Sequence, residues 1–262
     1  MMDVLRVINL DRAACRMRRF QAMHPEVPIR RVEAQDGATL DRHKLVHSGT
    51  FAQNNCFTAG ALGCAMSHLQ LWRMCLADGI PYHIAEDDVT LCEDFWTTAG
   101  HLLRGLDRWD IVLWGYNADW PLQFRGEYGN NPSLLITDIR TEVTPELRPR
   151  IAMPRLFGLI QAAGTTCYSI SAKGAARLLE RCLPIGGKRP SILDPLDGDR
   201  ERTLPPHAMR ARRLFVNKFA GLTQENNGID VELCNHYREL DAYVCLPSLT
   251  LHRFDTSDSS IQ

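Results

Sequence analysis

Three consecutive acidic residues, Glu86, Asp87 and Asp88, are the strongest chemical signal in the sequence. They directly follow the mostly apolar run of residues 80–85, which predicts a buried strand. In an extended chain, the side chains of Glu86 and Asp88 point to one side and that of Asp87 points to the other. Two carboxylates on one side predict a site for a hard cation, Mn²⁺ or Mg²⁺, which takes its remaining ligands from water and substrate phosphates.

The same triplet has a second interpretation as an acidic loop, since acidic residues commonly precede helices. Its surroundings favour the metal site, because the predicted elements alternate between strand and helix. Strands are predicted at residues 4–10, 29–34, 80–85, 109–115 and 165–170, and helices at 13–23, 58–78, 95–106 and 172–182. This alternation predicts an α/β fold with a mainly parallel central sheet flanked by helices, in which ligands bind beyond the carboxyl ends of the strands.

Length and composition exclude several classes of protein. The chain has 262 residues, which suits one large domain, and its formal net charge of -1 leaves no positive excess for binding nucleic acid. No apolar stretch reaches the ~20 residues of a membrane span, and the first residues lack a signal-peptide pattern, so we expect a cytoplasmic protein. Nine cysteines without any C-x-x-C motif predict reduced thiols rather than a disulfide framework or a zinc site.

Short motifs occur along the chain in the order and at spacings similar to those of one protein family. They are NLDR at residues 9–12 with Arg16, AQDG at 34–37, GALGCAMSH at 60–68, EDDV at 86–89, GTTCYSIS at 164–171 with Lys173-Gly174-Ala175, IDVEL at 229–233 and LPSL at 246–249. In these motifs the chain resembles glycosyltransferase family 25, which includes lipopolysaccharide galactosyltransferases and the related collagen galactosyltransferases. The resemblance covers nearly the whole chain.

The resemblance implies a GT-A-like nucleotide-sugar-binding fold in a single domain over residues 1–252. Residues 186–227 are dense in proline, glycine and charge, and they predict an insertion into that domain. Residues 253–262 are predicted to be a polar C-terminal tail.

The resemblance also implies an activity, the metal-dependent, inverting transfer of a hexose onto a lipopolysaccharide core or another surface glycan. The favoured donor is UDP-galactose, and the favoured cofactor is Mn²⁺, or Mg²⁺ in its place. Basic residues of the predicted insertion, such as Arg210, Arg212 and Arg213, leave open a lipid-linked oligosaccharide acceptor and peripheral contact with the inner membrane surface. Most such charge runs are solvated faces.

Individual residues take roles from the same resemblance. Asp88 and Glu86 are the expected cation ligands, and His252 is a third candidate because some GT-A enzymes place a histidine there. The candidates for donor binding are Asn9, Arg16, Asp36, Gly37, His68 and Asp87. Each of these also has a structural interpretation, as a strand end, a core ion pair, an ordinary turn or a hydrogen-bonded core histidine.

Asp230 is the candidate catalytic base, which would accept the proton of the acceptor hydroxyl. Asp194 is the alternative, since it also lies at a suitable distance from the predicted helix of residues 172–182, but Asp230 matches its local motif better. Asp230 has an equally good structural interpretation as the N-cap of a helix over residues 231–240.

Ala61 stands where the family usually has a glutamate. This difference leaves two other functions open: a catalytically silent protein that binds a nucleotide-sugar or glycan, and a nucleotide-sugar hydrolase or nucleotidyltransferase that uses the same acidic site. The complete acidic triplet argues against the silent protein. The hydrolase or nucleotidyltransferase would turn over the donor without a sugar acceptor.

Overall fold

The computed structural model describes residues 2–117, 120–126, 132–134, 153–190 and 223–252, with the backbone alone for Leu251 and His252. The strands are β1 (Leu5–Asn9), β2 (Ile29–Glu33), β3 (Tyr82–Glu86), β4 (Val89–Leu91), β5 (Ile111–Leu113), β6 (Leu122–Phe124), β7 (Ser133–Leu134), β8 (Arg155–Gln161), β9 (Cys167–Ile170), β10 (Ala242–Leu246) and β11 (Thr250–His252). The α-helices are α1 (Ala14–Met23), α2 (Arg42–His47), α3 (Ala59–Asp78), α4 (Phe95–Arg104), α5 (Ala172–Cys182) and α8 (Ile229–Leu233). Short 3₁₀ helices include η1 (Asp11–Ala13), η2 (Gly37–Thr39) and η4 (Tyr237–Glu239).

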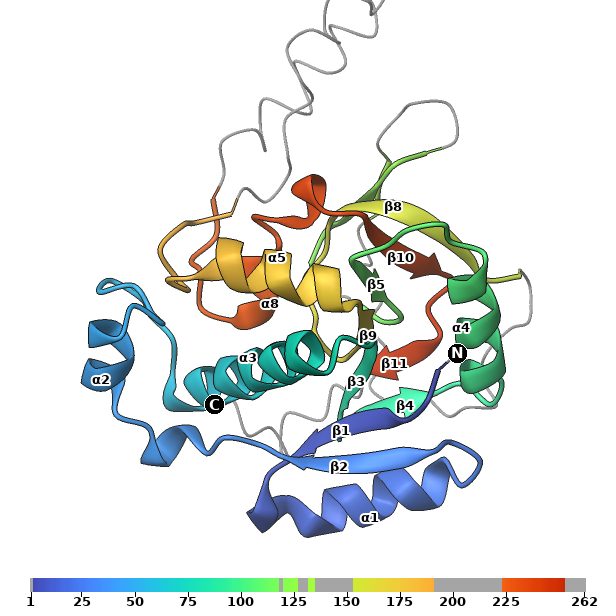
Figure 1. Ribbon diagram of the computed structural model, residues 1–262, viewed down its shortest axis with the longest axis horizontal. Helices are drawn as coiled ribbons and strands as arrows, with labels where there is room; N and C mark the ends of the chain where they lie inside the picture. The colour runs from blue at the N-terminus through green and yellow to red at the C-terminus, as the bar shows by residue number, and fades with distance from the viewer. Residues whose placement is uncertain (1, 118–119, 127–131, 135–152, 191–222, 253–262) are drawn as a thin grey trace, which may run out of the picture.

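A nine-stranded sheet forms the centre of the protein, with the strand order β2-β1-β3-β9-β5-β10-β8-β6-β7 (Figure 1). β1 pairs in parallel with β2 and β3, and β5 pairs in parallel with β10. The other five pairings are antiparallel. The fold is therefore α/β as predicted, but the prediction of a mainly parallel sheet is wrong. Alternating strands and helices give parallel neighbouring strands only where a helix returns the chain to the edge of the sheet at which the previous strand began. In the described residues no helix lies between β5 and β9, and these two strands are antiparallel.

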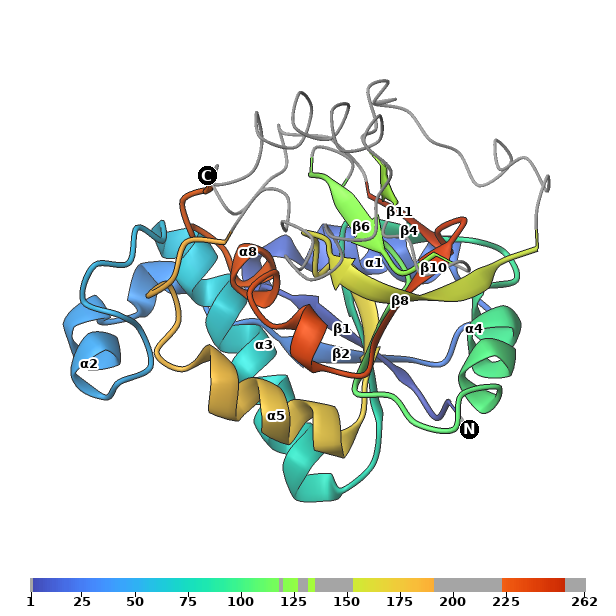
Figure 2. The ribbon, with the colours of Figure 1, turned by 90° about the horizontal axis from the view of Figure 1, so that it is seen from above.

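Helices cover both faces of the sheet, and each face has its own apolar core. On one face α3 and α5 pack against each other, together with α8 (Figures 1 and 2). On the other face lie α1 and α4. Successive residues of the central strands contribute to opposite cores, as in β5, where Ile111 and Leu113 face α3 and α5 while Val112 faces α4.

Helices α3 and α5 begin and end where the sequence predicts. The hydroxyl of Thr58 accepts a hydrogen bond from the Ala61 amide and so caps α3, and Gly79 ends that helix with a φ of 67°. The Ser171 hydroxyl caps α5 by accepting from the Gly174 amide at 2.9 Å. The predicted boundaries of α5, residues 172–182, are confirmed.

The C-terminal region differs from the prediction of a helix over residues 231–240. The chain forms the short helix α8 and then the 3₁₀ turn η4, before β10 returns to the sheet. Gly228, and not Asp230, is the N-cap of α8. Most of the predicted insertion, residues 191–222, and the predicted tail, residues 253–262, lie outside the described residues, so the domain boundaries stay predictions.

No helix in the described ranges is both long and apolar enough to cross a membrane. All nine cysteines are free thiols, and five of them are buried, namely Cys75, Cys92, Cys167, Cys182 and Cys245.

Candidate functional site

A cavity lies at the carboxyl ends of the parallel strands β1 and β3. The register pairs Ile8 of β1 with Glu86 of β3, which brings the end of the first strand beside the acidic triplet. The first turns of the helical segment after β1 and the N-terminal half of α3 complete its walls. This is the edge at which open α/β sheets bind ligands.

The acidic triplet forms the turn between β3 and β4. Asp87 and Asp88 are in turn conformation, and Val89 then starts β4, which belongs to the second, two-stranded sheet. Because the chain is not extended here, the alternation expected for Glu86, Asp87 and Asp88 does not apply, and all three line the cavity.

Asp87 is the buried member of the triplet. Its carboxylate accepts a hydrogen bond from Asn9 Nδ2 at 2.5 Å and pairs with the Arg16 guanidinium, and all three side chains are buried. Burial raises the pKa of Asp87, against the opposing effects of the Asn9 hydrogen bond and the Arg16 charge. Three of the predicted donor-binding residues, Asn9, Arg16 and Asp87, thus come together, and their contacts connect the end of β1, α1 and the acidic turn.

Asp88 and Glu86 are more open. The side chain of Asp88 is 27% exposed, and its Oδ2 lies 3.3 Å from a terminal nitrogen of Arg16. Glu86 Oε1 accepts a hydrogen bond from Thr165 Oγ1 at 2.8 Å, while the Glu86 amide donates to the carbonyl of Thr166. These contacts orient the two side chains, which stay partly exposed, 27% for Asp88 and 17% for Glu86.

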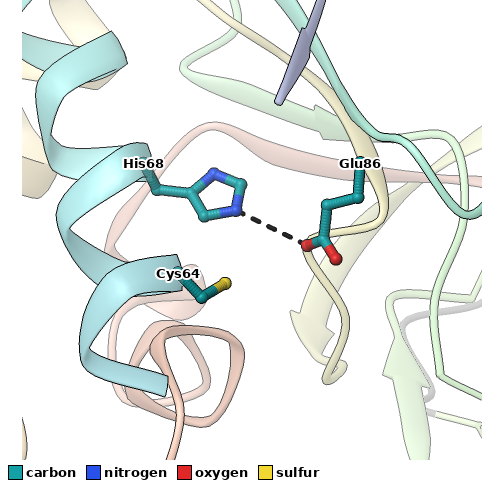
Figure 3. A group of neighbouring side chains, drawn as sticks. All are labelled: Cys64, His68 and Glu86. Atoms are coloured by element: carbon teal, nitrogen blue, oxygen red, sulfur yellow. Dashed lines mark ion pairs between the residues drawn. The ribbon is translucent and has the colours of Figure 1, made fainter. Parts of the chain in front are cut away.

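His68 connects Glu86 to the core beneath α3. Its Nδ1 lies 2.8 Å from the Tyr168 hydroxyl, which also accepts a hydrogen bond from Trp72 Nε1. Its Nε2 lies 3.5 Å from Glu86 Oε1, and the Cys64 side chain, one helical turn away, points into the same space (Figure 3). The structure therefore places His68 at the cavity but holds it in a buried network.

The carboxylates of Glu86 and Asp88 on one wall of the cavity offer hard oxygen ligands of the kind that Mn²⁺ and Mg²⁺ prefer. The third candidate ligand, His252, is in β11, where its backbone is paired with Val89, the residue after Asp88. The residues present at this turn fit a hard divalent cation, although at Asp88 the cation would share the carboxylate with the nearby Arg16.

Asp36 and Gly37 do not line the cavity themselves. Asp36 pairs with Arg12, which does line the cavity, and its carboxylate caps η2 through the Ala38 amide. Gly37 packs against the first turn of α3, so closely that a Cβ at this position would lie 1.6 Å from the Ala59 carbonyl oxygen. The turn interpretation therefore accounts for both residues, and they support the site indirectly.

Asp230 lies in the first turn of α8, where its Oδ2 accepts a hydrogen bond from Asn117 Nδ2 at 3.2 Å. Burial raises the pKa of the Cys64 thiol well above its ordinary value, and the charges of Glu86, Asp230 and Asp88 raise it further. Asp230 is thus close enough to the cavity wall for its charge to act on Cys64. Asp194 lies outside the described residues.

Sequence reasoning missed several residues of the site. Thr165, Tyr168 and Trp72 hold Glu86 and His68 in place, and Cys64 shares their space. Only the four-residue spacing of Cys64 and His68, which places both on one face of a helix, was a readable signal.

A family model described as "Glycosyltransferase family 25 (LPS biosynthesis protein)" matches residues 2–188 of the chain. Among curated proteins, "Probable inactive glycosyltransferase 25 family member 3" of Rattus norvegicus is 28% identical over 211 residues, which cover 73% of this chain and 33% of that protein. "Inactive glycosyltransferase 25 family member 3" of Mus musculus is 27% identical over 211 residues, covering 73% of this chain and 32% of that protein. The chain spans about a third of the length of these relatives.

Among solved structures, the "Crystal Structure of A197 from STIV" is similar at 12% identity, with 93% of this chain and 81% of that chain covered. Its TM-score of 0.37 is too low for the likeness to carry an argument.

Proposed function

Because this chain belongs to glycosyltransferase family 25, we propose that its cavity binds a nucleotide-sugar and that the protein transfers the sugar to a glycan acceptor. The observation that carries the proposal is the position of the acidic turn at the carboxyl ends of β1 and β3, in a cavity also lined by Arg12 and Arg16. Carboxylates suited to a cation, beside arginines suited to phosphates, match the charges of a nucleoside diphosphate.

Each charged group has a part in the proposal. Glu86 and Asp88 hold the cation, Mn²⁺ or Mg²⁺, which when bound neutralises charge on the leaving diphosphate. Asp87, held by Asn9, keeps the turn in place. Arg12, whose side chain is 56% exposed, is the arginine better placed to reach a donor phosphate.

Asp230 is the proposed general base for the acceptor hydroxyl. It accepts a hydrogen bond from Asn117, which holds its carboxylate, and its charge acts on the same thiol as those of Glu86 and Asp88. A base must come within about 3 Å of the hydroxyl that it deprotonates, so the acceptor would bind between α8 and the acidic turn.

We also propose finer assignments. By analogy with the family, they are UDP-galactose as donor, a lipopolysaccharide core or other surface glycan as acceptor, and inversion at the transferred carbon. Action in the cytoplasm with peripheral contact at the inner membrane surface is a separate proposal, supported by the basic residues Arg210, Arg212 and Arg213.

A catalytically silent binding protein is the second candidate. Two relatives are named inactive. Ala61, which replaces the usual glutamate, is buried in the apolar core and offers no charge to the cavity. Arg16 also lies 3.3 Å from Asp88, so its guanidinium already compensates part of the carboxylate charge that a metal ion would otherwise compensate.

An assay of UDP release and of the glycan product separates these candidates. With UDP-galactose, Mn²⁺ and a truncated lipopolysaccharide core, we expect the native chain to form product, and Asp230→Asn to lose at least about 100-fold in rate. Asp107→Asn, which changes an exposed aspartate outside the cavity, is the matched control. UDP release that needs no acceptor would identify a hydrolase, and saturable donor binding without turnover would identify the silent protein; either result overturns the proposal.

A further inference from the structure

Cys64, His68 and Glu86 converge on one point of the cavity wall (Figure 3). Cys64 and His68 are four residues apart on α3 and face the same way, while Glu86 ends β3. One ligand atom from each, the thiol sulfur, an imidazole nitrogen and a carboxylate oxygen, all lie within 4.8 Å of one another. We call these three residues the open cluster, because all of them line the cavity.

Two further observations indicate that the open cluster receives a ligand. His68 is completely buried, yet its Nε2 has no hydrogen-bond partner in the described part of the chain and points toward Glu86 at 3.5 Å. Negative charge also lies beside this point, because Glu86 Oε1 faces the imidazole at 3.5 Å and Asp88 lines the same cavity. A buried imidazole nitrogen without a hydrogen-bond partner, beside carboxylates, favours a cation.

We propose that Cys64, His68 and Glu86 form a binding site for a borderline divalent cation, with Zn²⁺ as the best match. Thiolate and imidazole ligands favour Zn²⁺, whereas Mn²⁺ and Mg²⁺ prefer carboxylates, carbonyls and water. Three protein ligands leave the fourth tetrahedral position open toward the cavity, for water or a substrate oxygen. Glu86 is also a proposed ligand of the donor cation, so the two sites would share this carboxylate. The Zn²⁺ inference goes beyond the proposed transferase function and stands on the geometry of Cys64, His68 and Glu86.

The surrounding hydrogen bonds can adapt to the ion. Binding releases the proton of the Cys64 thiol, because a thiolate is the ligand. His68 binds through Nε2 and carries its proton on Nδ1, from which it donates to the oxygen of Tyr168, 2.8 Å away. The Tyr168 hydroxyl can turn to accept this bond as well as the one from Trp72, and such a partner on the second ring nitrogen is usual for a metal-bound histidine.

Titration of the metal-free full chain with Co²⁺, a coloured substitute for Zn²⁺, tests the site. We expect one equivalent to produce the visible bands of tetrahedral cobalt and a sulfur-to-cobalt charge-transfer band, and Zn²⁺ to abolish both. Cys64→Ser should lose the charge-transfer band and bind Zn²⁺ at least about tenfold more weakly. Cys15→Ser, which changes an exposed cysteine, should behave like the native chain. A charge-transfer band that persists in Cys64→Ser, or none in the native chain, overturns the proposal.

X-ray absorption at the zinc edge needs no variant, and so keeps the test decisive if Cys64→Ser fails to fold. We expect one sulfur at about 2.3 Å and otherwise nitrogen and oxygen, whereas a shell of oxygen and nitrogen alone contradicts the site. Asp88→Asn separates the two proposals, because it should impair donor binding and leave the charge-transfer band intact. If the transferase proposal failed, the zinc-binding result could therefore still be interpreted on its own.

Discussion

Within the described residues, two groups of one cysteine, one histidine and one glutamate bring their ligand atoms close together, and the groups differ in what surrounds them. In the open cluster, Glu86 and the other two residues line a cavity. The second group, Cys182, Glu232 and His236, is fully buried near the end of α5 and around α8, and we call it the closed cluster. Similar ligand types therefore form an accessible site in one place and part of the core in the other.

Hydrogen bonding explains the difference. In the closed cluster, Glu232 Oε2 accepts from the Gly186 amide at 2.9 Å and from Asn226 Nδ2 at 2.5 Å, while Oε1 lies 2.9 Å from His236 Nε2. Both carboxylate oxygens are thus occupied by the protein itself. Gly186 and Asn226 flank the range 191–222, so Glu232 joins the two ends of the predicted insertion. A buried carboxylate whose two oxygens are bonded within the core stabilises the fold, whereas the open cluster lines a cavity that a ligand can enter.

Glu232→Ala should have the largest effect on stability. It leaves the Gly186 amide, Asn226 and His236 without their acceptor in a buried region, which should cost about 3–5 kcal/mol of unfolding free energy. Glu86→Ala, the matched change in the open cluster, should cost only about 1 kcal/mol, because its side chain is 17% exposed. Urea unfolding followed by circular dichroism measures both, and equal losses would contradict the comparison.

Acid should destabilise the protein through histidines that belong to neither cluster. Burial lowers the pKa of His24 and of His83 to about 4, from 6.5. Both are neutral in the fold, so the unfolded chain binds more protons below pH 6.5. The unfolding free energy therefore has its highest value above pH 6.5 and falls as the pH drops toward 4, by roughly 3 kcal/mol for His83 and by less for His24, which is less deeply buried. Urea midpoints measured from pH 7 to pH 4.5 should decline, and His83→Gln should flatten the slope.

Gly63→Ala should disturb the wall that carries the open cluster. A Cβ at Gly63 would lie 2.4 Å from the Gln35 carbonyl oxygen and 2.6 Å from the Gly37 amide nitrogen, both rigid backbone atoms. We expect a loss of about 1–3 kcal/mol in unfolding free energy and weaker donor binding. Gly100→Ala in α4 is the control, since its Cβ meets nothing closer than 3.6 Å and should stabilise the helix slightly. A neutral Gly63→Ala would contradict the close packing of this wall.

Asp88→Asn should have the smallest effect on stability, less than about 1 kcal/mol, because the ion pair with Arg16 that it weakens is partly exposed. Thermal unfolding measures this change. Asp87→Asn is the comparison, since Asp87 is buried against Asn9 and Arg16 and should lose more.

The local part of this architecture could be predicted from sequence because its signals lie within a few residues of each other. Thr58 and Gly79 mark the ends of α3, Ser171 marks the start of α5, and the acidic triplet directly follows an apolar strand. These features depend on capping and periodicity, which the sequence carries explicitly.

The remaining features depend on contacts between distant parts of the chain. The direction of β9 is set by pairing with β3 and β5, and no local pattern encodes it. His68 meets Tyr168 across 100 residues, and Gly37 is explained only by its packing against α3. The absence of a C-x-x-C motif argued against a zinc site. The ligand set that we propose is drawn from α3 and β3, so it becomes visible only in the fold.

Calorimetry of donor binding tests the central claim most directly. A panel of UDP-sugars would be titrated into the native chain with and without Mn²⁺, and into Asp88→Ala. The account predicts Mn²⁺-dependent binding of one UDP-sugar by the native chain and loss of that binding in Asp88→Ala. Absence of binding to every UDP-sugar, with and without Mn²⁺, would contradict the assignment of the cavity.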